Sequence, residues 1–163
     1  MAGLIQKVLV FVDGSEESIV AAHYAVCLSK TLNARLTALY VVNTRAVEDL
    51  VKTKIFLAAE QEEYTRDIES DAEKYLNHIK SLGRQKGVTV ETVQKHGAPF
   101  LEIKKEVQEQ DIDLLVIGEL SKIRSRRDEF YNEAERAMRN VSCSVLIVKD
   151  EDRVYEVYES MTV

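Results

Sequence analysis

This 163-residue chain has no tryptophan, a single proline and only two cysteines, Cys27 and Cys143. Two cysteines are too few for a disulfide scaffold, and a chain of this length buries enough surface to fold as one domain without cross-links. No apolar run approaches the roughly 20 residues of a membrane span, and the N-terminus lacks the segments of a signal peptide. We therefore expect a soluble, cytoplasmic, reduced protein with no membrane partner.

The charge balance is acidic, with 28 Asp and Glu residues against 22 Lys and Arg. Binding to nucleic-acid phosphates depends on clustered Lys and Arg, so no nucleic-acid partner is expected. The three histidines share no metal-ligand spacing with the two cysteines, so no metal site is expected either. Acids are concentrated between Glu60 and Glu73, which indicates either a solvated helix face or an acidic surface that binds a partner.

Apolar runs and helical spacings alternate along the chain. Continuous apolar runs, typical of strands buried on both faces of a parallel sheet, occupy residues 7–13, 36–42, 113–119 and 144–149. Residues 88–97 alternate apolar and polar, which indicates a strand nearer an edge. Helical spacing follows Ser15, fills 57–85, follows Pro99 and returns after Phe130, while residues 43–56 are either a short helix from Thr44 or irregular.

This alternation predicts an α/β fold, with three α/β/α layers around a five-stranded parallel sheet of order 3-2-1-4-5. Helix ends are marked locally, by Ser15 as an N-cap and by Asn33 as a left-handed C-cap. Ligands of such sheets bind beyond the carboxyl ends of the strands, at the switch point. Asp13, Val41 and Gly118 lie at or near such ends, so we expect any site there.

Three segments resemble the universal stress protein family: VLVFVDGSEES, VTVETVQKHGAPFLEIKKEVQEQDIDLLVIG and VSCSVLIVK. The last has Ser144 where proline is usual, and together the segments cover about residues 5–149. The resemblance implies a nucleotide-binding-like fold of the adenine nucleotide alpha hydrolase-like type. It also implies a universal stress protein domain over residues 1–149, which leaves residues 150–163 as a C-terminal acidic tail.

ATP-binding members of the family carry a phosphate-binding motif, Gly-x2-Gly-x9-Gly-Ser/Thr. Gly118 matches its first glycine, whereas Ser121, Tyr131 and Asn132 occupy the other three positions. Glycines in such a loop let backbone N–H groups approach phosphate, and the Tyr131 ring would fill that space. We therefore expect ATP binding to be lost or weakened, with no required cofactor and with ATP or AMP as doubtful ligands.

The other residues that the resemblance places near a nucleotide each have two interpretations. The resemblance implies that Asp13 approaches a bound nucleoside and that the Val41 backbone reads adenine; alternatively, Asp13 bonds nearby backbone N–H groups and Val41 is ordinary strand core. Gly118 is either part of the nucleotide site or a tight turn. Arg124 and Arg126 either contact phosphate by charge or belong to a solvated, self-paired loop.

Two functions follow from the resemblance. The first is a non-catalytic stress-response or signalling protein that acts as a homodimer and binds an unidentified protein partner. The second is an adenine-nucleotide-binding regulatory module, for ATP or AMP, with slow ATP hydrolysis. We name no catalytic residue, because Asp13 is the only positioned base that the sequence suggests.

Family members pair their last strands across a two-fold axis, so the resemblance implies a homodimer through residues 144–149. An edge strand with unpaired backbone groups recruits another chain unless it is covered. The apolar residues of the tail, Val154, Tyr155, Val157 and Tyr158, either cover this edge or reach across to the partner. We favour a tail packed across the dimer interface.

Overall fold

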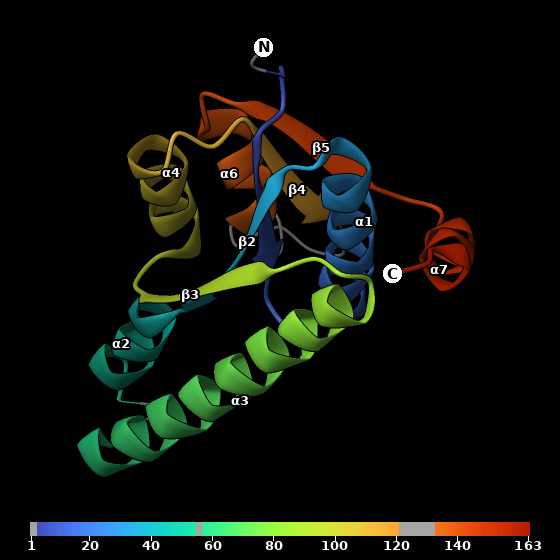
Figure 1. The fold of residues 1–163 in the computed structure, drawn as a ribbon. Coiled ribbons are helices and arrows are strands. Elements are labelled where there is room, and N and C mark those ends of the chain that lie inside the picture. The colour runs from blue at the N-terminus through green and yellow to red at the C-terminus, as the bar shows by residue number, and fades with distance from the viewer. Residues whose placement is uncertain (1–2, 55–56, 121–132) are drawn as a thin grey trace.

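Five parallel strands form one sheet in the order β3-β2-β1-β4-β5 (Figure 1). The structure is a computed structural model and describes residues 3–54, 57–120 and 133–163. The strands are β1 (Lys7–Val12), β2 (Arg35–Val42), β3 (Val90–His96), β4 (Leu114–Gly118) and β5 (Ser144–Val148). The predicted strand order is thereby confirmed, and the alternating segment β3 lies at an edge, as its pattern indicated.

Helices cover both faces of the sheet, which confirms the three-layer prediction. They are α1 (Glu16–Leu32), α2 (Thr44–Lys52), α3 (Ala58–Gln85), α4 (Pro99–Glu109), α6 (Glu133–Asn140) and α7 (Glu151–Ser160). Helices α1 and α3 pack on one face, and α4 and α6 on the other (Figure 1). Among the described residues, none of the helices combines the length and the apolar character that crossing a membrane requires.

The core is divided by the sheet into two layers. Val8, Val10 and Val12 of β1 face α1 and α3, whereas Leu9 and Phe11 face α4 and α6. All five side chains are at most 5% exposed, because β1 is the central strand and is covered on both faces. Each such side chain contributes roughly 1.5–3 kcal/mol relative to an exposed one, so the continuous apolar run is what places this strand at the centre.

The caps of α1 are those that the sequence predicted. Ser15 Oγ accepts a hydrogen bond from the Ser18 backbone N–H at 3.2 Å, and Asn33 adopts the left-handed conformation with φ 52°. Thr44 begins a short helix, which decides between the two alternatives for residues 43–56 over the part that the structure describes. These features depend on neighbouring residues alone, so local chemistry suffices to predict them.

The segment after β5 forms a further helix, and its predicted packing across a dimer interface stays a prediction. Residues 151–160 form α7, which packs against α1 of the same chain. Asp150 adopts φ 57°, turns the chain and caps the helix by accepting from the Arg153 N–H. Val154 and Tyr158 lie one helical turn apart and are both buried, so the apolar face of this amphipathic helix packs against its own chain.

Candidate functional site

A cavity of about 220 Å³ lies at the carboxyl ends of the adjacent strands β1 and β4. This is the switch point of the sheet, where ligands of doubly wound folds bind. Its wall is formed by the ends of both strands, the first turn of α1 and the beginning of α6. The lining residues are Phe11, Asp13, Ser15, Glu17, Ser18, Gly118, Glu119, Leu120 and Ala134.

Asp13 is held by the turn that joins β1 to α1. Its Oδ1 accepts hydrogen bonds from the Ser15 backbone N–H at 3.0 Å and from the Ser15 hydroxyl at 2.6 Å. Its own backbone N–H donates to Ser18 Oγ at 3.3 Å. Asp13 therefore has the local structural role that the sequence allowed, and its exposed carboxylate also lines the cavity.

Gly118 lets β4 end very close to α1. A Cβ atom at this position would lie 2.5 Å from both the carbonyl carbon and the carbonyl oxygen of Glu17. Only glycine fits such an approach, so the residue is required for packing as well as lining the cavity. The same approach brings Glu17 to the site.

Negative charge dominates the lining. Three carboxylates, those of Asp13, Glu17 and Glu119, face it, and the described lining residues include no Lys or Arg. Two hydroxyls, on Ser15 and Ser18, complete the polar groups. Within the described ranges, no group of three or more His, Cys, Asp or Glu side chains is arranged to hold a metal ion. The described part of the lining is suited to hydrogen-bond donors such as sugar hydroxyls, and its carboxylates disfavour anions.

The structure does not bring Val41 into this cavity. Val41 is 6% exposed and packs with Leu9, Phe11 and Leu39 in the core layer below α4 and α6. Its side chain is therefore strand core, and the backbone contact with adenine that the resemblance implies stays a prediction. The remaining predicted site residues, Ser121, Arg124, Arg126 and Asn132, lie outside the described residues, as does Tyr131.

Glu133 joins the N-termini of α4 and α6, and Ala134 of α6 lines the cavity. The Glu133 Oε2 accepts a hydrogen bond from the Phe100 backbone N–H at 2.9 Å, in the first turn of α4. Its Oε1 lies 3.6 Å from a guanidinium nitrogen of Arg136, and that guanidinium stacks 3.8 Å from the centre of the Phe100 ring. The N-terminus of α4 thus already has a carboxylate, which anchors α6 to α4.

Sequence reasoning missed Glu17 and Glu119 as site residues. Glu17 is one of two acids in the first turn of α1, and Glu119 is one acid beside a basic loop. Glu119 directly follows β4, and Glu17 lies in the first helical turn after β1. These positions at the carboxyl ends of central strands are the signal that could have identified them. Their convergence depends on the pairing of β1 with β4.

Comparison with known proteins gives consistent results. The model of the universal stress protein family matches residues 4–149. A universal stress protein of Methanocaldococcus jannaschii is 30% identical over 148 residues, which are 90% of this chain and 83% of that protein. A universal stress protein of Bacillus subtilis is 30% identical over 149 residues, which are 90% of this chain and all of that protein.

Solved structures show the same fold at lower identity. Universal stress protein UspA of Lactobacillus plantarum superposes with a TM-score of 0.72 at 21% identity, over 91% of this chain and 100% of that chain. A universal stress protein in complex with cAMP superposes with a TM-score of 0.67 at 20% identity, over 90% of this chain and 99% of that chain. An AMP-bound family member from Arabidopsis thaliana superposes with a TM-score of 0.64 at 18% identity, over 91% of this chain and 94% of that chain. By its sequence match over residues 4–149 and its sheet of order 3-2-1-4-5, the chain belongs to the universal stress protein family.

Proposed function

We propose that this protein is a non-catalytic stress-response or signalling member of its family, which acts as a homodimer and in which ATP binding is lost or weakened. The observation that carries the loss of ATP binding is the acidic lining of the cavity. Carboxylates of Asp13, Glu17 and Glu119 face the space that a nucleotide at the switch point would enter. Ionised carboxylates and phosphate oxygens both only accept hydrogen bonds, so they repel each other without compensation.

Two further features support this proposal. The N-terminus of α4, which is a favourable place for an anion, is occupied by the Glu133 carboxylate. In the sequence, Ser121 and Tyr131 stand where the family motif has glycines. The homodimer is supported by β5, which lies at the edge of the sheet and pairs only with β4 among the described residues.

A second candidate function is an adenine-nucleotide-binding regulatory module. It is favoured by the cavity itself, which keeps Asp13 and Gly118 together at the switch point. Two similar structures contain cAMP and AMP, which carry one phosphate each. A ligand of this kind needs less positive charge than ATP does, and the Asp13 carboxylate can accept hydrogen bonds from ribose hydroxyls.

Thermal-shift measurements with ATP, ADP, AMP and cAMP test both candidates, because a ligand that binds only the folded state raises its stability by mass action. We expect millimolar ATP to give little stabilisation of the natural chain. Binding of ATP with a micromolar dissociation constant would contradict the proposal. Stabilisation by AMP or cAMP but not by ATP would favour the second candidate.

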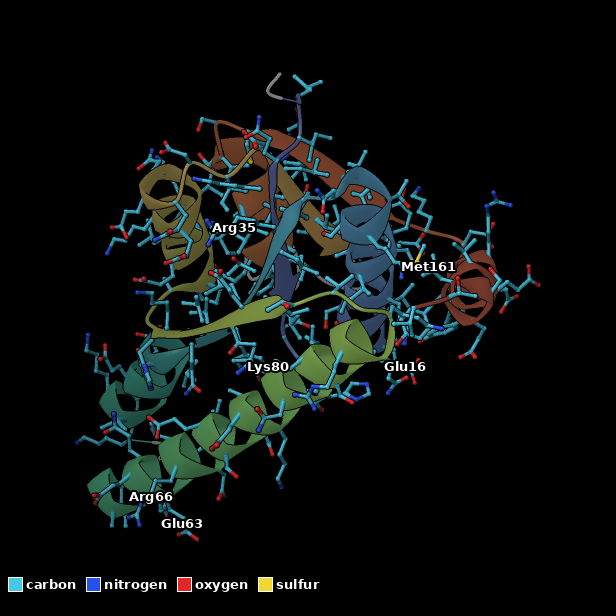
Figure 2. All side chains as sticks on the ribbon, in the orientation of Figure 1. Glu16, Arg35, Glu63, Arg66, Lys80 and Met161 are labelled. Carbon is cyan, nitrogen blue, oxygen red and sulfur yellow. The ribbon has the colours of Figure 1, made fainter. Side chains whose placement is uncertain are left out.

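Two sets of variants distinguish charge repulsion from steric exclusion as the cause of weak ATP binding. If charge repels the phosphates, Glu17→Gln with Glu119→Gln raises ATP affinity. Glu16→Gln is the matched control. Glu16, which is labelled in Figure 2, lies in the same first turn of α1 but is not among the residues that line this cavity. If steric exclusion is the cause, Ser121→Gly with Tyr131→Gly raises ATP affinity instead. Failure of both sets would show that some other feature controls nucleotide binding.

A further inference from the structure

A second cavity, of about 280 Å³, lies between α1 and α7, away from the switch point. One wall is α1 and the other is the segment from Lys149 to Met161. The family match ends at residue 149, so nearly all of the second wall lies outside the region that this chain shares with the family model. The site therefore differs from the nucleotide site of the family, and the inference goes beyond the proposed function.

The two helices run side by side in the same direction. Their N-terminal ends border a common small cavity, to which Glu16, Glu17 and Glu151 contribute. At the other end the Lys30 ammonium donates a hydrogen bond to the Thr162 carbonyl, and the Lys86 ammonium donates to the Met161 carbonyl at 2.9 Å. The groove between α1 and α7 is thus closed by contacts at its far end, and it has a defined direction.

Polarity changes along this groove. The groove is lined at every fourth position from 149 to 161, which places these residues on one side of α7 and of the residues that flank it. Lys149 and Arg153 come first, and Val157 and Met161 follow. Figure 2 shows the labelled Met161 between α7 and α1. Where α7 begins, the groove is lined by two cationic residues, Lys149 and Arg153, together with Asp150, and where α7 ends it is apolar.

The opposite wall continues the apolar surface. It consists of Tyr24, Cys27, Leu28 and Thr31, which are spaced along one side of α1. Val157, which lines the groove, is 39% exposed, so apolar surface is left open to solvent. Within the part of the chain that the structure describes, no ion pair engages the Lys149 or Arg153 side chain; the Asp150 side chain caps α7 instead.

We infer that the groove between α1 and α7 binds an anionic amphiphile, with an acidic head group at Lys149 and Arg153 and a hydrocarbon chain that extends towards Met161. Arg binds carboxylates through paired, charge-assisted hydrogen bonds, and Lys adds a second positive charge. The cavity is near the lower end of the size range of small-molecule sites, which suits a chain of medium length. A fatty acid of about ten carbons is the simplest ligand of this class.

The test uses the full chain and decanoate as the probe, below its micellar concentration. The chain has three methionines, Met1, Met138 and Met161, so methyl-labelled methionine gives three resonances. Met138 packs in the core layer on the opposite face of the sheet and is the internal control. We expect decanoate to shift the Met161 methyl resonance saturably and to leave that of Met138 unchanged.

Two comparison ligands test the head group. Decanol has the same chain without the charge, and decyltrimethylammonium has the opposite charge. We expect both to bind at least about tenfold more weakly than decanoate, since a hydrogen bond to a charged group contributes enough for such a factor. Equal binding of decanol would overturn the inference, and so would the absence of a saturable Met161 shift with decanoate.

Variants test the location of the site. Lys149→Gln with Arg153→Gln replaces exposed charges and is expected to lower decanoate affinity by about tenfold or more. Lys80→Gln, on the exposed side of α3, is the matched control and leaves the affinity unchanged (Figure 2). Leu28→Trp fills the groove and abolishes binding, with circular dichroism as the check of folding. A Met161 shift that follows protein concentration without ligand would show that a second copy occupies the groove, which also overturns the inference.

Discussion

At the scale of single residues, Gly118 shows how one side chain, or its absence, controls the site. Its hydrogen leaves room for the first turn of α1, and this approach positions Glu17 against the end of β4. Gly118 is thus a packing residue. A role in packing alone is sufficient reason for glycine at this position.

Gly118→Ala is expected to lower the free energy of unfolding by about 1–3 kcal/mol, because the new methyl group would meet rigid helix backbone at 2.5 Å. Urea denaturation measures the change. Gly3→Ala is the matched control, since a Cβ there has no neighbour within 4 Å among the described residues. Equal stability of Gly118→Ala and the natural chain would show that α1 moves away at little cost.

His23 makes stability depend on pH. Burial lowers the pKa of His23 below its ordinary value of 6.5; the hydrogen bond to the Ile19 backbone and the charge of Glu159 oppose this shift, and His78 adds to it. The unfolded chain therefore binds a proton before the folded chain does, so the folded state loses stability as pH falls below about 6.5. The contribution of His23 is fully present above that pH and declines until the folded-state pKa is reached.

His23→Phe is expected to reduce the loss of unfolding free energy between pH 7.5 and pH 5.5, as measured by denaturant titration at several pH values. Phenylalanine keeps an aromatic ring beside Tyr155 and Tyr158, whose ring centres both lie 4.8 Å from that of His23. His78→Gln, at an exposed position, is the control and retains most of the pH dependence. An identical pH profile for His23→Phe would exclude this histidine as the cause.

At the scale of elements, α7 is a helix held from several sides. Tyr158 donates a hydrogen bond from its hydroxyl to the Leu82 carbonyl at 2.8 Å, and the Lys86 ammonium lies 4.6 Å from the centre of its ring. The same helix covers a face of α1 that does not touch the sheet. This is why α1 is buried on more than one side.

Tyr158→Phe is expected to lower the free energy of unfolding by about 0.5–1.5 kcal/mol, the usual contribution of one buried hydrogen bond. Tyr155→Phe is the matched control, because Tyr155 packs on the same histidine but no hydroxyl bond joins it to the described residues. Thermal and urea denaturation measure both variants. A larger effect for Tyr155 than for Tyr158 would contradict the assigned anchor.

At the scale of the whole molecule, the open question is assembly. β5 leaves one edge of the sheet without a strand partner among the described residues, and α7 packs on α1. We expect a homodimer at micromolar concentration in analytical ultracentrifugation, formed through β5. A full-length monomer under these conditions would rule out the dimer.

A chain that ends at Lys149 lacks α7 but keeps β5, so it tests which of the two elements forms the dimer interface. Because α7 packs within its own chain, we expect this shorter chain to dimerise as the full chain does, at lower thermal stability. Circular dichroism provides the check that it folds. Loss of dimerisation in a folded chain would instead place α7 in the interface, as the sequence first suggested.

The sequence by itself determined the strands, the helix caps and the fold class. An apolar run such as that of β1 is stable only when both faces are covered, and Ser15 and Asn33 act on backbone groups within a few residues. Only the tertiary structure decided that Glu17 and Glu119 converge with Asp13, that Val41 is core, and that α7 packs on α1. These outcomes depend on pairs of residues far apart in the chain. An amphipathic pattern indicates that a face will be buried, whereas the partner of that face is set by packing.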